Sequence, residues 1–176
     1  MKGMKSLVAY FSRKGDNYVN GAIMNLPIGN TEVAANIIRK LTGGDAFRIQ
    51  TVDDYPADYN KTTDVAKREQ RENARPKLSG RLDTLYEYSL IFLGYPNWWG
   101  TMPMAVFTFL ENHDFSGKTI VPFCTHEGSG LGRSESDIKR TCPHATVLTG
   151  LSIRGGSVQR AENDISAWLS ISGVPI

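Results

Sequence analysis

Residues Ser89–Tyr95 read SLIFLGY and form the most continuously apolar stretch of the 176-residue chain. Such a run is too short for a typical helix and predicts a strand buried on both faces, as in the centre of a parallel sheet. It is also far too short to span a bilayer. Pro103, a little further on, suits the start of a helix that turns Val106, Phe109 and Leu110 toward a core.

The same alternation of strand and helix extends from this unit in both directions. The alternation of strand and helix occurs five times, which predicts an α/β fold with an open, doubly wound parallel sheet and helices on both faces. In such sheets ligands bind at the carboxyl ends of the strands, so the loops after the first, third and fourth strands are the ones to inspect. Further strands are predicted over 6–11, 46–52, 118–124 and 145–151, and helices over 31–41, 133–142 and 157–172, the last capped by Ser157.

The composition excludes several classes of protein. Hydrophobic residues make up 40% and charged residues 22% of the chain, and the formal net charge is +2. These values predict a single globular domain over residues 1–176 and exclude disordered, collagen-like and disulfide-scaffold proteins. The N-terminal segment has two lysines, but its apolar run is too short for a secretory signal, so we expect a cytoplasmic protein without a membrane span.

Metal and thiol chemistry find little support. Cys124 and Cys142 do not form a CxxC pair, and His113, His126 and His144 lack the spacing of a zinc site. Cys124 ends a predicted buried strand, where a small apolar side chain is expected. We therefore expect no metal centre and no cysteine nucleophile.

The segment 58–81 interrupts the alternation and carries seven basic against four acidic residues, an excess of +3. It predicts a solvated helix followed by a loop at Pro76. The alternative is a docking patch for an acidic partner. Nucleic acid is not expected as a partner, because the whole-chain charge is modest and no recognition motif is present.

The first loop leads from Ser12 to the predicted helix that starts near Thr31. Unpaired backbone N–H groups at a helix N-terminus favour an anion, and the side chains of Ser12, Asn30 and Thr31 add donors to phosphate oxygens. The loop has neither the GK[ST] ending of a nucleoside-triphosphate loop nor a GxGxxG dinucleotide fingerprint. It therefore favours a single phosphate, with helix capping by Thr31 as the simpler alternative.

The second loop, residues 94–103, places Trp98 and Trp99 directly after the strongest strand. Stacking of a planar ring on an indole contributes about 0.5–1.5 kcal/mol beyond the burial of area. The two tryptophans therefore favour a flat heterocyclic ligand. The alternative is that one indole packs on the adjacent helix and the other lies half-exposed.

The third loop, residues 125–132, contains three glycines and lets the main chain fold closely around a ligand. His126 and Glu127 permit acid–base chemistry, but no spacing fixes a second partner for either. The alternative is that His126 is a loop residue whose ring only contacts ligand or solvent. No catalytic residue is assigned.

At this point the loops together resemble the flavodoxin family, and within it flavodoxin-like proteins with an extended first loop. Four stretches carry the resemblance, in the same order and after the same strands as in the family. They are YFSRKGDNY (10–18), IGNTE (28–32), GYPNWWG (94–100) and THEGSG (125–130).

The resemblance implies a five-stranded sheet of order 2-1-3-4-5 that binds one FMN. It places Ser12, Asn30 and Thr31 at the phosphate and the second loop at the isoalloxazine ring, with Trp98 as the stacking residue. The third loop wraps the other edge of the ring. The implied cofactor-binding residues are Ser12, Arg13, Asn17, Tyr18, Asn30, Thr31, Pro96, Asn97, Trp98, Trp99, Gly100, Thr125, His126, Glu127, Gly128, Ser129 and Gly130.

The function that the resemblance implies is electron transfer through the bound flavin, with a redox partner protein or a small-molecule electron donor or acceptor. Two departures stand out: about a dozen residues separate Asn17 from Gly29, and the sequence pI is near 8.5, whereas carrier flavodoxins are usually acidic. An FMN-dependent NAD(P)H:quinone or azo oxidoreductase is the second hypothesis, and a binding module without flavin the third. A monomer or a homodimer is expected.

Overall fold

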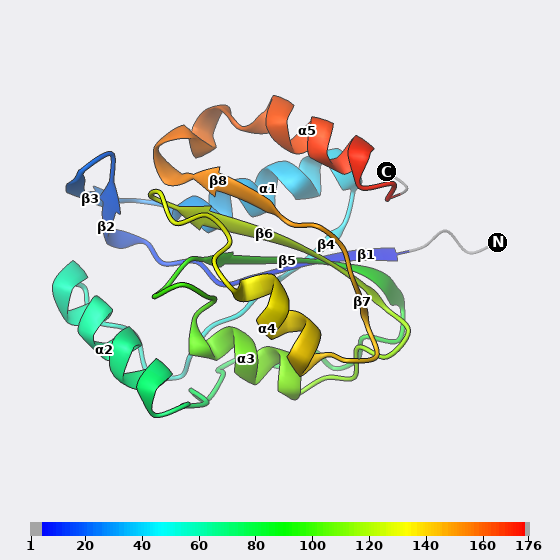
Figure 1. Cartoon of the computed structure of the whole chain (residues 1–176), viewed down its shortest axis with the longest axis horizontal. Coiled ribbons are helices and arrows are strands. Elements are labelled where there is room, and N and C mark those ends of the chain that lie inside the picture. Colours follow the sequence, from blue (N-terminus) through cyan, green and yellow to red (C-terminus); the bar gives the residue numbers. More distant parts are fainter. Residues whose placement is uncertain (1–4, 175–176) are drawn as a thin grey trace.

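The computed structural model describes residues 5–174, and its centre is a parallel sheet (Figure 1). Within this range the sheet has six strands in the order β4-β1-β5-β6-β7, with β8 also paired to β6. This arrangement confirms the predicted α/β fold with order 2-1-3-4-5, since β7 and β8 share the fifth place. The strands are β1 (Lys5–Tyr10), β4 (Asp45–Arg48), β5 (Tyr88–Pro96), β6 (Thr119–His126), β7 (Thr146–Val147) and β8 (Leu151–Arg154). The first four residues, part of the segment weighed as a secretory signal, lie outside the described range.

The fifth strand was predicted as one piece over 145–151 and is instead divided into β7 and β8. The break lies opposite Pro122 of β6, since Ile120 pairs with Val147 and Phe123 with Leu151. The carbonyl of Ile120 accepts the N–H of Leu148. Backbone groups two residues apart in a strand point to the same side, so the backbone of Pro122 also faces the fifth strand. Proline has no N–H to donate, and the ladder is interrupted there. The strand predicted over 46–52 is likewise shorter, because β4 ends at Arg48.

Helices cover both faces of the sheet (Figure 1). The helices α1 (Asn30–Thr42) and α5 (Glu162–Ile171) bury their apolar sides on one face, and α3 (Met104–Glu111) and α4 (Ser134–Thr141) on the other. The N-cap prediction for Ser157 is wrong, because a 3-10 helix over Gly155–Arg160 precedes α5 and Ala161 occupies the cap position. The chain turns so tightly after β8 that Ser157 lies inside this turn.

The extended first loop is an antiparallel hairpin rather than irregular chain. Its strands are β2 (Gly15–Val19) and β3 (Ala22–Leu26), joined by Asn20 and Gly21 with φ of 52° and 86°. Both residues adopt the left-handed backbone that a tight two-residue hairpin turn requires. Figure 1 shows this hairpin and α2 (Tyr59–Arg71) at the same end of the sheet. Helix α2 confirms the helix predicted in the charged segment.

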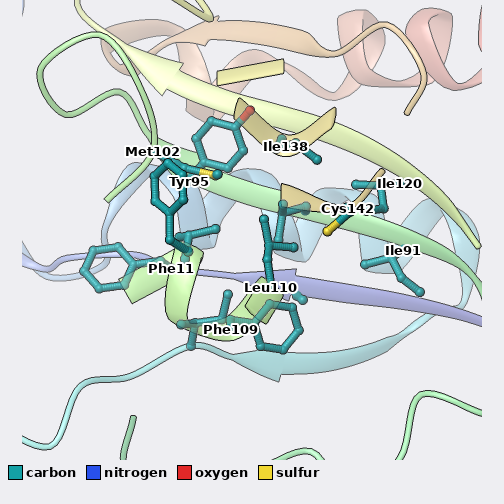
Figure 2. Close-up of a cluster of buried hydrophobic side chains, with 14 of the residues drawn as sticks. Phe11, Ile91, Tyr95, Met102, Phe109, Leu110, Ile120, Ile138 and Cys142 are labelled. Atoms are coloured by element: carbon teal, nitrogen blue, oxygen red, sulfur yellow. The ribbon is translucent and has the colours of Figure 1, made fainter. Parts of the chain in front are cut away.

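The larger core lies between the sheet and the α3–α4 layer (Figure 2). Tyr95 is fully buried there, and its hydroxyl donates to Ser134 Oγ at 2.8 Å. Phe109 stacks against Phe47 with ring centroids 5.5 Å apart. This packing fixes the end of β5, from which the tryptophan-containing loop departs.

Both cysteines are free and buried in this core, and burial raises the pKa of Cys124 to about 12 and of Cys142 to about 11. The thiolate is the reactive form, so neither residue can react quickly in the folded protein. We expect no thiol to react with Ellman's reagent at pH 8 in native protein and both to react in guanidinium chloride. Fast reaction of one thiol in native protein would contradict the burial of that side chain.

Candidate functional site

A cavity of about 310 Å³, which we name the main cavity, lies at the carboxyl end of the sheet between the loops after β1, β5 and β6, the first of which carries the hairpin. Its volume is within the range of small-molecule sites. The position is the switch point between β1 and β5, from which the sheet continues in opposite directions. The lining residues are Ser12, Arg13, Asn17, Tyr18, Asn30, Thr31, Tyr59, Pro96, Asn97, Trp98, Thr125, His126, Glu127, Gly128, Ser129 and Gly155.

The N-terminus of α1 forms one end of the cavity. Ser12 Oγ accepts the backbone N–H of Glu32 at 3.0 Å, so Ser12, and not Thr31, provides the side-chain cap of this helix. Because Oγ accepts there, the hydroxyl proton of Ser12 remains available for a ligand. The hydroxyls of Thr31 and Thr125 are bonded to each other at 2.8 Å. This end of the cavity thus combines hydroxyl donors with the positive end of a helix dipole.

Arg13 supports the walls of the cavity. Its guanidinium donates to the carbonyls of Pro56 at 2.6 Å and Ala57 at 2.8 Å, and also to the carbonyl of Asp16. Burial lowers the pKa of Arg13, although nearby Asp16 favours its charged form. Asn17 likewise donates its amide to the carbonyls of Arg13 and Gly15. Arg13 therefore ties the first loop to residues 56 and 57, whereas Asn17 holds the start of the hairpin together.

Another part of the cavity wall is aromatic. Trp98 packs edge-on against Tyr55 and Phe11, with ring centroids 5.0 and 5.2 Å apart. Tyr18 of the hairpin stacks on Tyr59 of α2 at 6.1 Å. Burial, and then the proximity of Tyr18, raise the pKa of Tyr59, which stays a neutral donor. The cavity therefore joins a polar end at α1 to an aromatic side near α2.

Trp99 and Gly100 lie beside the cavity rather than on its wall. They form a tight turn between Trp98 and Thr101 with φ of 56° and 86°. The indole of Trp99 is 46% exposed, donates to the carbonyl of Thr63 at 2.9 Å and carries the ammonium of Lys67 4.8 Å from its ring centroid. Trp99 also lines a smaller pocket of about 110 Å³, together with Trp98, Tyr59 and other residues of α2. Five residues of this smaller pocket also line the main cavity.

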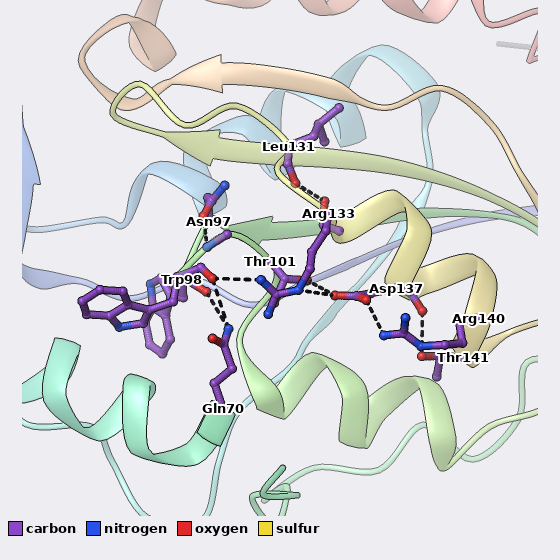
Figure 3. A network of polar contacts seen from close by, with 12 residues as sticks. Gln70, Asn97, Trp98, Thr101, Leu131, Arg133, Asp137, Arg140 and Thr141 are labelled. Atoms are coloured by element: carbon purple, nitrogen blue, oxygen red, sulfur yellow. Dashed lines mark hydrogen bonds and ion pairs between the residues drawn. The ribbon is translucent and has the colours of Figure 1, made fainter. Parts of the chain in front are cut away.

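A polar network fixes the second and third loops to each other (Figure 3). Asn97 donates its amide to the carbonyl of Gly130 at 2.8 Å and accepts the N–H of Gly100 at 2.9 Å. Deeper in the protein the buried carboxylate of Asp137 accepts the hydroxyl of Thr101 at 2.6 Å and lies 3.4 Å from Arg133 Nε. Gly100 and Gly130 therefore take part in the hydrogen bonds that connect the two loops, and neither lines the cavity.

The third loop closes on itself through His126. Its Nδ1 accepts the N–H of Gly128 at 2.8 Å, which assigns the ring proton to Nε2. Burial, and then the charge of Arg154, lower the pKa of His126 from its ordinary value of 6.5, while Glu127 raises it. The neutral imidazole is thus the form that the loop stabilises.

This depressed pKa predicts a pH-dependent stability. At pH values between the pKa of His126 in the folded protein and 6.5, the unfolded chain binds more protons at His126 than the folded protein does. The stabilisation that comes from keeping His126 neutral is therefore complete above pH 6.5 and is lost as the pH falls through the pKa of the folded protein. We expect the unfolding free energy to decline more between pH 7.5 and 5.5 in the wild type than in His126→Asn, by less than about 1 kcal/mol because the ring is partly exposed. Urea titrations at both pH values measure it, and identical declines would contradict it.

Fourteen of the 17 residues assigned from the sequence line the main cavity, and Trp99, Gly100 and Gly130 do not. Tyr59 and Gly155 also line it and were not anticipated. Tyr59 follows the helix cap Asp58 in a charged segment, and Gly155 begins a Gly-Gly pair after β8; neither signal points to a ligand. For the hairpin, by contrast, the sequence does carry a signal, since Asn20-Gly21 between the apolar residues Val19 and Ala22 is typical of a tight hairpin turn.

Between residues 5 and 174 no helix is long and apolar enough to cross a membrane. Over the same range no three or more His, Cys, Asp or Glu side chains gather into a group that could hold a metal ion.

An open parallel sheet of order 2-1-3-4-5, with a cavity at the switch point that joins a helix N-terminus to an aromatic wall, defines the class of flavodoxin-like proteins. The family profile of the flavodoxins matches residues 5–171, nearly the whole chain. The chain belongs to the flavodoxin family.

Solved structures agree with this assignment. A protein from Bacteroides eggerthii, named provisionally as a flavoprotein, is 31% identical over 97% of this chain and 99% of its own, with a TM-score of 0.79. A similarly named protein from Bacteroides uniformis is 30% identical over 94% and 99%, with a TM-score of 0.74. A flavoprotein in complex with FMN from Lactobacillus acidophilus shares the fold at 20% identity, over 94% and 99%, with a TM-score of 0.64. A search of the curated proteins gives no match.

Proposed function

We propose that this protein transfers electrons through an FMN held in the main cavity. FMN is the cofactor that its membership of the flavodoxin family implies, and the Lactobacillus acidophilus protein of the same fold is in complex with FMN. The observation that carries the proposal is the convergence of three loops, the first of which carries the hairpin, on one cavity of about 310 Å³. Bound FMN supplies reversible one- and two-electron chemistry, and the protein orients the cofactor and sets its electrostatic surroundings.

The donor set of the cavity fits a phosphate at α1 and a flat ring near Trp98. Ser12 and Thr31 offer hydroxyls beside the helix N-terminus, which stabilises an anion without a basic side chain. Trp98 and Tyr59 offer apolar surface to a planar ring and exclude water from it. Pro96, Asn97 and the third loop complete the proposed binding residues, and Arg13 and Asn17 act on the ligand through the hairpin.

The visible spectrum of purified protein, followed by titration of the apoprotein with FMN, tests this proposal. We expect a yellow protein with flavin absorption bands and stoichiometric quenching of flavin fluorescence. A colourless protein that does not quench added FMN would overturn the proposal and leave a binding module without flavin. Titration with riboflavin in parallel measures what the phosphate contributes at the end of the cavity near α1.

A reductase is the second candidate function, and the small pocket beside Trp98 and Trp99 favours it. This pocket shares a wall with the main cavity and offers space for part of a second molecule next to the first. An NAD(P)H:quinone or azo oxidoreductase needs such a space, whereas a carrier between proteins does not. Steady oxidation of NADH or NADPH by the pure holoprotein with a quinone would favour the reductase, and its absence the carrier.

The remaining expectations stay predictions. They are a cytoplasmic location, a single domain over residues 1–176, a monomeric or homodimeric state and a redox partner protein or small molecule. The basic segment 58–81 stays a docking hypothesis. Two of its basic side chains already make contacts within the protein, since Arg75 pairs with Glu111 at 2.8 Å and Lys67 lies over the ring of Trp99.

A further inference from the structure

The carboxylate of Glu127 is only half satisfied by the protein. Its Oε2 accepts the backbone N–H of Asn20 at 3.0 Å, whereas Oε1 is buried and has no hydrogen-bond partner among the described residues. A buried acceptor without a donor is costly, so such atoms call for a donor from outside the chain. Glu127 lines the main cavity, and the missing donor can come from its occupant.

The surroundings of Oε1 define the kind of donor. Gly155 has no side chain, and the space that its Cβ would fill is bounded by Asn30 Nδ2 and Glu127 Oε1, each 2.5 Å from that position. The amide nitrogen donates and the carboxylate oxygen accepts, so this pair suits a group that does both. An aliphatic hydroxyl is such a group. A phosphate only accepts, and the carboxylate would repel it.

We propose that Glu127 and Asn30 bind a hydroxyl of the ligand's polyol chain, so that Glu127 selects flavins with a ribityl chain. This inference rests on the proposed function and deepens it. It differs from the expectation that the third loop wraps the isoalloxazine ring, because Glu127 lies next to Asn30 at the start of α1. The phosphate is left to the hydroxyls of Ser12 and Thr31 beside the N-terminus of α1.

The same carboxylate links the ligand to the hairpin. Asn20 forms the hairpin turn, and its side-chain amide lies so close to Gly156 that a Cβ there would be within 3.0 Å of it. A hydroxyl that donates to Oε1 fixes the rotamer in which Oε2 reaches the N–H of Asn20. Ligand binding and closure of the β2–β3 hairpin therefore stabilise each other, as linked equilibria must.

Three flavins separate this role from a general one: FMN, riboflavin, and lumiflavin, which has a methyl group in place of the polyol. We expect Glu127→Ala to weaken FMN and riboflavin each by roughly tenfold to a hundredfold, the range for a hydrogen bond to a charged group, and lumiflavin by less than about twofold. Glu127→Gln should recover part of the loss. Gly155→Ala, which places a methyl group between Asn30 and Glu127, should give the same selective loss. Fluorescence titration measures all of these affinities.

Hydrogen exchange in the hairpin is the second readout. FMN should slow exchange across β2 and β3 in the wild type and much less in Glu127→Ala, while the exposed Glu162→Gln behaves as wild type. Equal loss of all three flavins, or no loss of any, would overturn the polyol assignment while FMN binding by the wild type still stands. Failure of the wild type to bind FMN would instead overturn the proposed function, and this inference with it.

Discussion

Replacement of Gly29 by alanine is expected to weaken FMN binding at least about a hundredfold, or 2.7 kcal/mol. Gly29 precedes α1 with φ −65° and ψ 150°, an ordinary extended conformation, so alanine meets no backbone strain. Its Cβ would lie 2.6 Å from the carbonyl oxygen of Arg13 and still closer to Ser12 Oγ. The first loop must move away from the helix to relieve this contact, and the donors of Ser12 and of the helix N-terminus then no longer converge.

Titration of apoprotein with FMN and with riboflavin measures this effect. Because the displaced donors serve the phosphate, the loss should be larger for FMN than for riboflavin. Gly80→Ala is the matched control, since a Cβ there would lie 3.9 Å from the ring of Phe47, an ordinary contact, at an exposed position. Wild-type FMN affinity in folded Gly29→Ala would contradict the placement of the phosphate at α1.

The sequence predicts the sheet because each strand carries its own signal. The run Leu90–Leu93 is buried on both faces of β5, and continuous apolar character is the local consequence of that position. The fifth strand fails for a different reason. Its interruption is caused by Pro122, which belongs to β6, and only the pairing of the two strands brings that missing N–H opposite residues 148–150.

The site follows the same division between local and tertiary signals. Ser12, Asn30 and Thr31 lie at strand and helix ends, where the fold class alone directs attention. Tyr59 and Gly155 reach the cavity from α2 and from the turn after β8, and nothing in their sequence neighbourhood distinguishes them. Arg13 is the converse case, because its charge is visible in the sequence but its hydrogen bonds to the carbonyls of residues 56 and 57 are not.

At Gly94 in β5 a single added methyl group is expected to destabilise the fold strongly. Gly94 pairs with Phe123 of β6, and three carbons of the fully buried Phe123 ring would lie within 3.0 Å of a Cβ added to Gly94. On its other side β5 is paired with β1, where Gly94 faces Tyr10, so β5 cannot shift to make room. We expect Gly94→Ala to lower the unfolding free energy by about 3 kcal/mol, the upper range for overpacking of a core.

A double variant shows whether this clash is the cause. Phe123→Leu alone should cost about 1–2 kcal/mol by loss of ring contacts, but it removes the atoms that the new methyl group would meet. In the Phe123→Leu background Gly94→Ala should therefore cost at least about 1 kcal/mol less than in the wild type. Urea unfolding of the four proteins, as apoprotein so that cofactor binding does not contribute, measures the coupling. Strict additivity would mean that the cost of Gly94→Ala comes from the strand backbone and not from the Phe123 ring.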